Sequence, residues 1–349
     1  MSEGAKLGRA SKMFDIFLLE PGGAAALDPQ RVIDTVLESG TVRRGLRATT
    51  QLYYRNDDTS VMFQVILAPH VAGLLGEAAV EEEAADAQKE DEAASEEEPE
   101  AGTDEVVEFP LVTLHLPVIR PTFFALEAIE FAGKLSSALG LQMEHASVLD
   151  DAPEGAASAG SGEGKPAAVL ESWLRSNRKA ALEVKDRTSL TFWSARKSRE
   201  YWAYGRARAA LAAEFEPAGI QVPPLYLVAR DSLKKTLFVW DQGTPSVIPR
   251  TDLVLVRRER VKSGLLRSKR VVEEGIASGE AVAEILAASG EVRSVPTDHI
   301  VWRGGPGTPR TVEDRLGSLR LEPADSVQRT ELSNILDVDL SSDPAEAVT

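Results

Sequence analysis

The stretch "YYRNDDTSVMF", residues 53–63, decides how the first half of this chain folds. Two runs rich in β-branched and aromatic residues, 46–55 and 59–67, flank the central "NDD", and this pattern predicts a β-hairpin. Asparagine and aspartate tolerate turn conformations and bond their own backbone. Their oxygens could also hold a hard cation, but the spacing and the final glutamate of a calcium loop are absent. We therefore predict a turn at "NDD" that fixes the register of the hairpin.

Helices and strands are predicted on both sides of this hairpin. Asp28 suits a helix N-cap, Pro29 the first helical position and Gly40 the helix end. The predicted elements are a strand at 13–20, a helix at 28–40, the hairpin, a strand at 108–118, a helix at 120–140 and a strand at 141–149. This order predicts an α+β domain over residues 13–150, a two-layer split β-α-β fold of the ferredoxin-like kind with helices on one face of a mostly antiparallel sheet.

Strand periodicity predicts which side chains point away from the helices. If Tyr54 and Phe63 point inward, Tyr53 and Met62 point outward, and the same alternation places Leu111 outward. The outward set mixes aromatic, methionine and polar side chains, as protein interfaces do. We predict that this face binds a protein partner; cover by the second domain and a scattered exposed surface are the alternatives. The candidate partner-binding residues are Phe17, Leu19, Tyr53, Met62, Ile66 and His115.

In element order and spacing, residues 13–150 resemble the C-terminal domain of ZipA, the bacterial division protein that binds a short FtsZ peptide on its open sheet face. The matching stretches are "FDIFLLE" (14–20), "YYRNDDTSVMFQVIL" (53–67), "PLVTLHLPV" (110–118) and "FFALEAIEFAGKLSSALG" (123–140). The resemblance is one of pattern and covers about two fifths of the chain. It implies that a peptide segment of the partner would bind on the open sheet face.

The net charge of −16 is distributed unevenly along the chain. It is −18 over residues 1–166, +8 over 167–310 and −6 over 311–349. Within the first part, fourteen acidic residues accompany a single lysine at 77–105, so this insert repels itself and has little to bury. We predict that this insert is disordered. The same prediction covers an N-terminus at 1–12, a flexible Gly/Ser/Ala linker at 151–166 and an acidic, mostly disordered tail at 304–349.

Residues 167–303 form a second predicted α+β domain, which is basic. Seven Lys and Arg fall within 256–270, and 196–208 interleaves basic with aromatic residues, as in proteins that bind phosphates and bases. The alternative function is therefore nucleic-acid binding, with the acidic insert as a competitor; docking of an acidic protein segment and a solvated surface are also consistent with the charges. The candidate residues are Arg196, Lys197, Arg199, Arg206, Arg257, Arg258, Arg260, Lys262, Arg267, Lys269 and Arg270.

The sequence shows no common catalytic motif, and we predict no catalytic residue, no metal site and no cofactor. The absence of Cys excludes disulfides and thiol chemistry, and only four His are present. No stretch has the apolar length of a membrane span, so we expect a cytoplasmic protein without membrane contact.

In the tail, Leu332, Ile335 and Leu336 form either a partner-binding motif or a last strand or helix of the second domain. The oligomeric state is left open.

Overall fold

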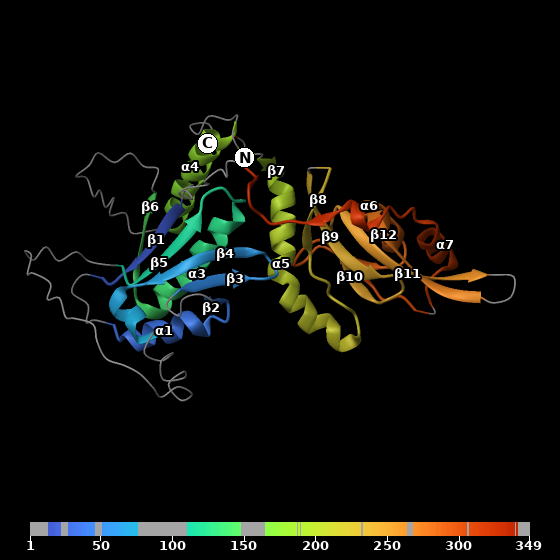
Figure 1. The fold of residues 1–349 in the computed structure, drawn as a ribbon. Coiled ribbons are helices and arrows are strands. Elements are labelled where there is room, and N and C mark those ends of the chain that lie inside the picture. Colours follow the sequence, from blue (N-terminus) through green and yellow to red (C-terminus); the bar gives the residue numbers. More distant parts are fainter. Residues whose placement is uncertain are drawn as a thin grey trace, which may run out of the picture. The chain divides into compact units, whose positions relative to one another are not determined.

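The chain forms two compact units (Figure 1). Unit 1 comprises Met1–Asn56, Val61–Arg187 and Leu340–Thr349, and unit 2 comprises Asp57–Ser60 and Thr188–Asp339. The computed structural model describes residues 13–21, 27–45, 51–75, 110–147, 165–186, 188, 190–231, 233–263, 268–305, 307–338 and 340. For 146–147, 260–263 and 268–270 the description covers the backbone alone. The segments predicted to be disordered at 1–12 and 77–105, and 151–164 of the linker, lie outside the described residues.

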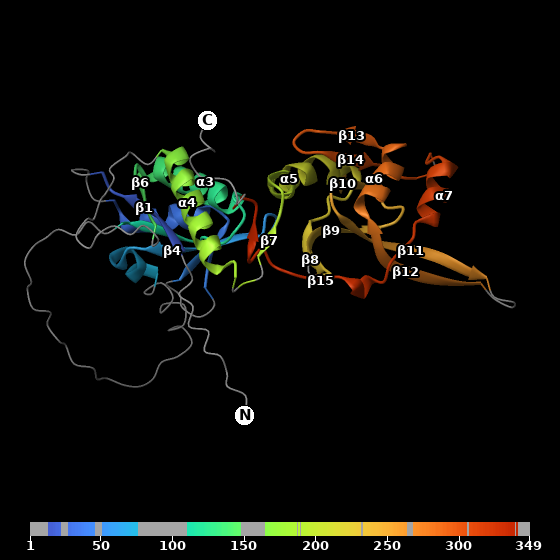
Figure 2. The same cartoon turned by 90° about the horizontal axis from the view of Figure 1, so that it is seen from above.

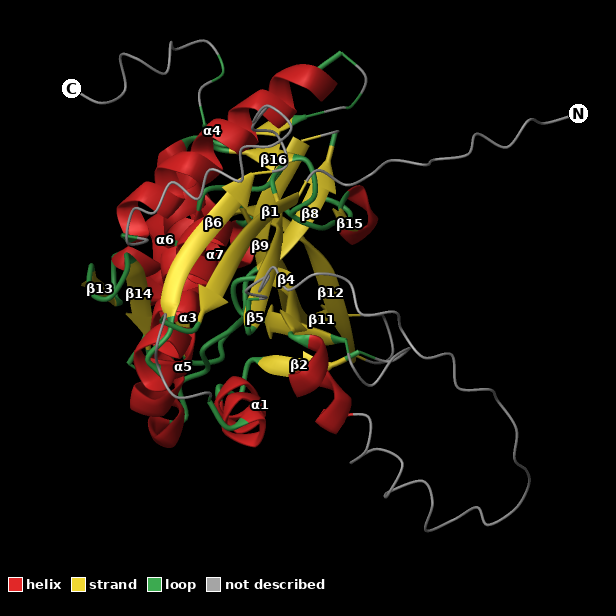
Figure 3. Cartoon of the chain, turned by 90° about the vertical axis from the view of Figure 1, so that its left-hand side faces the viewer, coloured by secondary structure: helices red, strands yellow, loops and turns green. Residues whose placement is uncertain are grey.

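Unit 1 is built on a six-stranded sheet with the strand order β2-β3-β4-β5-β1-β6, and all of its strand pairs are antiparallel. Its elements are β1 (Met13–Leu19), α1 (Pro29–Glu38), β2 (Val42–Arg44), β3 (Leu52–Asn56), β4 (Val61–Leu67), a helical stretch at 69–75, β5 (Val112–Pro117), α3 (Phe123–Leu139), β6 (Gln142–Ser147) and α4 (Pro166–Val184). Helix α3 packs against α1 and α4, and Figure 3 shows α3 and α4 on the same side of this sheet. The predicted α+β class is confirmed.

The local signals in the sequence act as expected in unit 1. Asp28 caps α1 by accepting a hydrogen bond from Gln30 N at 3.1 Å, and Gly140 ends α3 with a left-handed φ of 71°. Residues 57–60 form the turn between β3 and β4, which confirms the turn prediction for the hairpin. The hairpin register, in which Tyr54 lies opposite Phe63, therefore follows from the turn.

The core of unit 1 lies between the sheet and α3. Tyr54 and Phe63 stack with their ring centroids 4.5 Å apart, and both rings contact Phe131 of α3. All three side chains are at most 5% exposed. Because the strand period is two, burying these rings turns the intervening residues of β3 and β4 to the opposite face.

Unit 2 contains a five-stranded sheet, β12-β11-β9-β8-β15, and a three-stranded sheet, β10-β14-β13. Its elements are β7 (Thr191–Phe192), α5 (Ala195–Phe215), the 3-10 helix η1 (Glu216–Ala218), β8 (Tyr226–Arg230), β9 (Leu233–Asp241), β10 (Ser246–Pro249), β11 (Leu253–Ser263), β12 (Ser268–Ser278), α6 (Gly279–Ala287), β13 (Glu291–Arg293), β14 (His299–Trp302), α7 (Arg310–Ser318), the 3-10 helix η2 (Ala324–Ser326), β15 (Gln328–Arg329) and β16 (Ile335–Leu336). The pairing of β9 with β11 is parallel, and the other pairs of the five-stranded sheet are antiparallel.

The chain after α7 crosses one face of the five-stranded sheet, and we call residues 319–329 the strap (Figure 2). Glu322 pairs with Ile276 at the β12 edge through two backbone hydrogen bonds of 2.8 and 2.9 Å, and β15 pairs with β8 at the opposite edge. Between these edges, Val327 packs on a buried apolar cluster. The members of this cluster are Val228, Leu237, Leu253 and Ile276.

Two predicted boundaries differ from the structure. Helix α4, which we assigned to the second domain and partly to the linker, groups with unit 1, because its buried side chains pack on that unit. The tail prediction of disorder from residue 304 is wrong for 310–336, which contain α7, the strap and β16. An acidic segment can fold when a few of its apolar side chains pack on an apolar surface formed by the rest of the domain, as Val327 packs on the cluster beneath the strap.

Candidate functional site

The outer face of the six-stranded sheet is the side that strand alternation turns away from the buried core. One row across four neighbouring strands contains Tyr53, Gln64, His115 and Asp15. The adjacent row contains Ile66, Thr113, Phe17 and Glu144. These eight residues, together with Leu19 and Met62, form what we call the outer face. The backbone register thus brings together all six of the residues predicted from the sequence to bind a partner.

Two apolar side chains of β4 are exposed on the outer face, one on each side of Gln64 along the strand. Met62 is 54% and Ile66 41% exposed, whereas Phe63 and Val65, which alternate with them, are 2% and 0% exposed. Since β4 lies between β3 and β5, this exposure is not that of an edge strand. Burying apolar surface gains about 25 cal/mol per Å², and the unbranched methionine side chain adapts to irregular surfaces. The two side chains offer apolar contacts on either side of Gln64, and we call this pair the apolar centre.

Larger side chains flank this apolar centre and are held in place. Phe17, Leu19 and Tyr53 are partly buried. The Tyr53 hydroxyl donates to Gln51 Oε1 at 3.2 Å. An aromatic ring that is already ordered loses little conformational entropy on binding, which favours its use as an anchor.

A polar pair lies beside the apolar centre. His115 Nδ1 and Asp15 Oδ1 are 2.5 Å apart, and their side chains are 30% and 21% exposed. The carboxylate orients the imidazole ring, and in the neutral ring with the proton on Nδ1 the other nitrogen, Nε2, is an acceptor. Gln64 lies opposite His115 on β4 and supplies an amide that can donate and accept. These groups suit hydrogen bonds to the polar backbone of a bound segment.

The scaffold beneath the outer face contains a buried carboxylate that the sequence did not lead us to expect. Glu127 of α3 is 1% exposed and accepts hydrogen bonds of 2.7 Å from the Tyr54 hydroxyl and the Asn56 amide. This ties the hairpin to the helix. The available signal was the four-residue spacing of Glu127 from the buried Phe123 and Phe131, which places all three on one helix face.

Two positions near this face differ from the sequence prediction. Leu111, predicted to point outward, is 3% exposed, because it precedes β5 and its backbone bonds Leu18 and Ala68. Asp15 was not recognised as part of the face. Its two-residue spacing from Phe17 on β1 was the signal that could have identified it.

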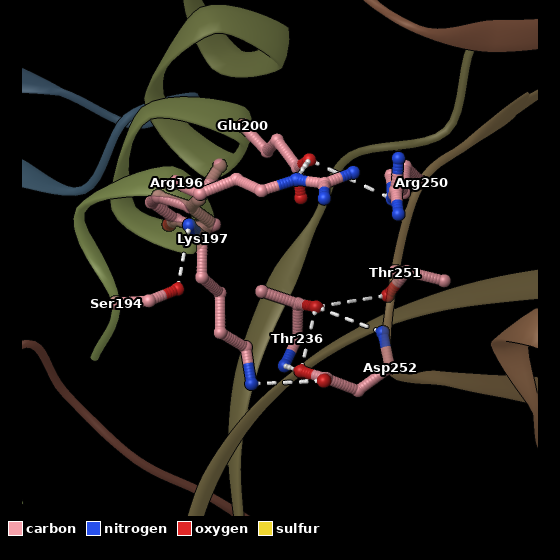
Figure 4. A pocket seen from close by; sticks show the side chains of 9 residues that line it. Ser194, Arg196, Lys197, Glu200, Thr236, Arg250, Thr251 and Asp252 are labelled. Atoms are coloured by element: carbon pink, nitrogen blue, oxygen red, sulfur yellow. Dashed lines mark hydrogen bonds and ion pairs between the residues drawn. The ribbon is translucent and has the colours of Figure 1, made fainter. Parts of the chain in front are cut away.

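Two of the predicted basic residues, Arg196 and Lys197, line a charged pocket in unit 2 of about 270 Å³ (Figure 4). Arg196 Nε lies 2.8 Å from Glu200 Oε1 across one turn of α5, and this hydrogen bond raises the pKa of Arg196. Lys197 Nζ lies 2.8 Å from Asp252 Oδ1. Arg250 also approaches Glu200, at 3.6 Å. Each cation of the pocket therefore has a carboxylate beside it.

Asp252 has a structural role in the same pocket. Its Oδ2 accepts hydrogen bonds from the backbone N and the hydroxyl of Thr236, at 2.7 and 3.0 Å. The carboxylate thus joins the start of β11 to β9 and holds Lys197 of α5 against them. This network of compensated charges links a helix to a sheet and leaves little net attraction for an anion.

The other predicted basic residues of α5 make local contacts. Arg199 Nε donates to Ala195 O, and the Arg206 guanidinium lies 5.7 Å from the centroid of the Trp202 ring. Such contacts within one helix are typical of a solvated helix face.

The basic stretch of β11 and β12 begins with two neutralised residues. Arg257 Nε lies 3.0 Å from Glu274 Oε2, and Arg258 Nε lies 2.6 Å from Glu273 Oε2. The Arg258 side chain is 5% exposed and also donates to carbonyl oxygens at the end of α7, including Leu316 O at 3.1 Å. We therefore withdraw Arg258 from the candidate nucleic-acid contacts. Arg260, Lys262, Lys269 and Arg270 lie on strands whose backbone is described, and Arg267 lies outside the described residues.

The apolar tail motif is part of the fold of unit 2. Ile335 and Leu336 form β16, which pairs in parallel with β7, and Leu332, Ile335 and Leu336 are at most 3% exposed. The strand alternative therefore describes these residues. Their burial removes them from the candidate partner contacts.

No group of three or more His, Cys, Asp or Glu that could hold a metal ion occurs among the described residues. Within the same part of the chain, no helix has both the length and the apolar character required to cross a bilayer. No protein-family model, no curated protein and no solved structure matches the chain.

Proposed function

We propose that this protein is a non-catalytic adaptor or regulator that binds a segment of a protein partner on the outer face of unit 1. We further propose that unit 1 is a ZipA-like split β-α-β domain, with the same mode of peptide recognition. The observation that carries the proposal is the exposure of Met62 and Ile66, at 54% and 41%, on an interior strand. A cytoplasmic location is part of the proposal.

The chemistry of the face indicates what such a segment would contain. The apolar centre at Met62 and Ile66 would accept one or two large apolar side chains. His115 and Gln64 would form hydrogen bonds with the backbone or a side-chain amide of the segment, so that neither polar group is left unpaired when the face is buried. The underlying bond between Tyr54 and Glu127 keeps the hairpin in one position, which lowers the entropic cost of binding.

The test uses aspartate substitutions on the outer face of the full chain. Affinity capture from the native cell identifies partners of the parent protein, and calorimetry with each purified partner measures Kd. Tyr53→Asp, Met62→Asp and Ile66→Asp together should weaken binding at least about 100-fold, because docking would bury unpaired carboxylates. The double variant Met62→Asp/Ile66→Asp, whose positions are the most exposed, guards against a loss of folding.

The matched control places the same charges at exposed apolar positions of unit 2. Val292 and Val295 are 65% and 80% exposed, so Val292→Asp/Val295→Asp should fold and retain the partner. An outer-face variant that remains folded and keeps the parent Kd for every captured partner would refute the proposal.

A further inference from the structure

The β11–β12 hairpin extends beyond the sheet to which it belongs. The two strands pair over eleven positions, from Leu253↔Ser278 to Ser263↔Ser268, whereas β9 pairs with β11 only as far as Arg257. Residues 258–263 and 268–273 therefore continue as a two-stranded ribbon (Figure 1). A strand pair without further neighbours is marginally stable in water, so this extension requires an explanation.

The charges of the ribbon change along its length. At its base each arginine has an acidic partner, as in the ion pair of Arg258 and Glu273. In the distal part, residues 260–263 and 268–270 contain four basic residues and no acidic one. These are Arg260, Lys262, Lys269 and Arg270.

The register opposes like charges at the far end of the ribbon. Lys262 lies directly opposite Lys269, and their neighbours in the register are Val261↔Arg270 and Ser263↔Ser268. Like charges at directly opposed positions destabilise a strand pair. A polyanion held beside the strands would remove that penalty.

We propose that this ribbon binds the phosphate backbone of double-stranded nucleic acid, without sequence preference. The major groove of a DNA duplex is about 12 Å wide and admits a two-stranded ribbon, with phosphates along both of its walls. Six residues on each strand reach about 20 Å, and the basic residues occur on both strands, so that each strand can meet one phosphate wall.

The distal ribbon shares no residue with the charged pocket or with the outer face. The cations of the pocket have carboxylate partners within unit 2, and the four basic residues of the distal ribbon come from a different stretch of the chain. The proposal thus assigns nucleic-acid contact to one part of the predicted basic set. It stands or falls independently of partner binding by unit 1.

The experiment measures fluorescence anisotropy of a labelled 20-base-pair duplex of mixed sequence with the full chain over a series of salt concentrations. The variant replaces Arg260, Lys262, Lys269 and Arg270 by glutamine. Each lost phosphate contact should reduce the slope of log K against log salt by about 0.9, so four contacts should reduce it by about 3 to 4. We expect the affinity at low salt to fall at least about 30-fold.

The control variant removes the same number of charges from exposed residues elsewhere, namely Lys134→Gln, Arg175→Gln, Arg310→Gln and Arg315→Gln. It should change the duplex affinity less than about threefold, since only long-range attraction is altered. Circular dichroism of both variants reports whether they fold.

Three results would overturn the proposal. The first is no duplex binding by the parent at low salt. The second is equal duplex binding by the ribbon variant and the control variant. The third is ribbon-dependent binding of phosphatidylserine vesicles, or of an acidic peptide with the sequence of residues 77–105, without competition by the duplex.

Discussion

The two large sheets of this protein differ in whether another segment of the chain covers one of their faces. In unit 2, the strap crosses the face of the five-stranded sheet, and the cluster that includes Val228 and Ile276 is at most 5% exposed beneath it. In unit 1, Met62 and Ile66 stay exposed on the outer face of the six-stranded sheet. An apolar sheet face can be covered by the chain's own segment or left exposed, and this difference is why we propose that the sheet face of unit 1, and not that of unit 2, binds a protein partner.

Two devices in unit 2 allow the strap to approach its sheet. Gly275 on β12 lies so close to the strap that a Cβ atom there would meet Glu322 O at 2.6 Å and Leu321 Cβ at 2.8 Å. Arg230 of β8, which is separated from β12 by β9 and β11, forms an ion pair with Glu322. The strap is therefore held against the five-stranded sheet by specific contacts, with Gly275 at the point of closest approach.

The largest effect is expected where the strap leaves α7. Arg258→Gln removes a buried guanidinium that donates to Leu316 O and Gly317 O, at 3.1 and 3.2 Å, and pairs with Glu273. We expect unit 2 to lose about 3 kcal/mol of unfolding free energy. Urea unfolding followed by tryptophan fluorescence measures this, because four of the five tryptophans lie in unit 2.

The neighbouring Arg257 supplies the matched control for this prediction. Its side chain is 45% exposed and pairs with Glu274, so Arg257→Gln should cost about 0.5 kcal/mol. Equal losses for the two variants would mean that Arg258 does not anchor the strap.

A smaller effect is expected at the closest approach of the strap. Gly275→Ala introduces a methyl group that Glu322 must avoid, which strains its two backbone hydrogen bonds to Ile276. We expect a loss of about 2 kcal/mol. The same unfolding experiment applies, and amide hydrogen exchange at Glu322 should accelerate.

The same substitution in open space should have the opposite sign. A Cβ at Gly317 of α7 would meet nothing within 4 Å, so Gly317→Ala should stabilise the helix by about 0.5 kcal/mol. A stabilising effect of Gly275→Ala would show that the strap is not held close to β12.

The sequence predicted those parts of the fold in which local rules and packing agree. Asp28, Gly140 and the turn at 57–60 supply caps and turns, and the period of two in β3 and β4 separates buried from exposed residues. Strand β12 was not predicted, because its charged residues obscure the alternation of apolar and polar residues. Its formation depends on pairing with β11 along its whole length. Long-range pairing is not encoded in local pattern.

The site could be predicted only in part for the same reason. Alternation placed Met62 and Ile66 on an open face, but the pairing of Asp15 with His115 joins strands that are 100 residues apart in sequence. The strap was predicted to be disordered because an acidic composition says nothing about a preformed apolar surface elsewhere in the chain. Local chemistry identified candidates, and tertiary contacts decided which of them remain accessible.

The smallest effect depends on pH and concerns α5 in unit 2. The buried Tyr204 hydroxyl donates to Pro223 O at 2.7 Å, and burial raises its pKa. A raised folded-state pKa means that the stabilisation is complete below the unfolded value of about 10 and is lost as pH rises above it. At pH 8, Tyr204→Phe should lower the free energy of unfolding by about 1 kcal/mol because the hydrogen bond is removed. The phenylalanine has no hydroxyl that could ionise at higher pH.

The parent and Tyr204→Phe should therefore exchange their order of stability in alkaline solution. Above pH 10 the parent loses up to about 1.4 kcal/mol per pH unit relative to Tyr204→Phe, so near pH 11 the variant should be the more stable in urea. A difference that stays constant from pH 8 to pH 11 would show that Tyr204 ionises as readily in the folded state as in the unfolded chain. A crossing would show that ionisation of this buried hydroxyl limits the stability of unit 2 in alkaline solution. Tyr204 lies on α5, whereas the other variants test how the strap is held.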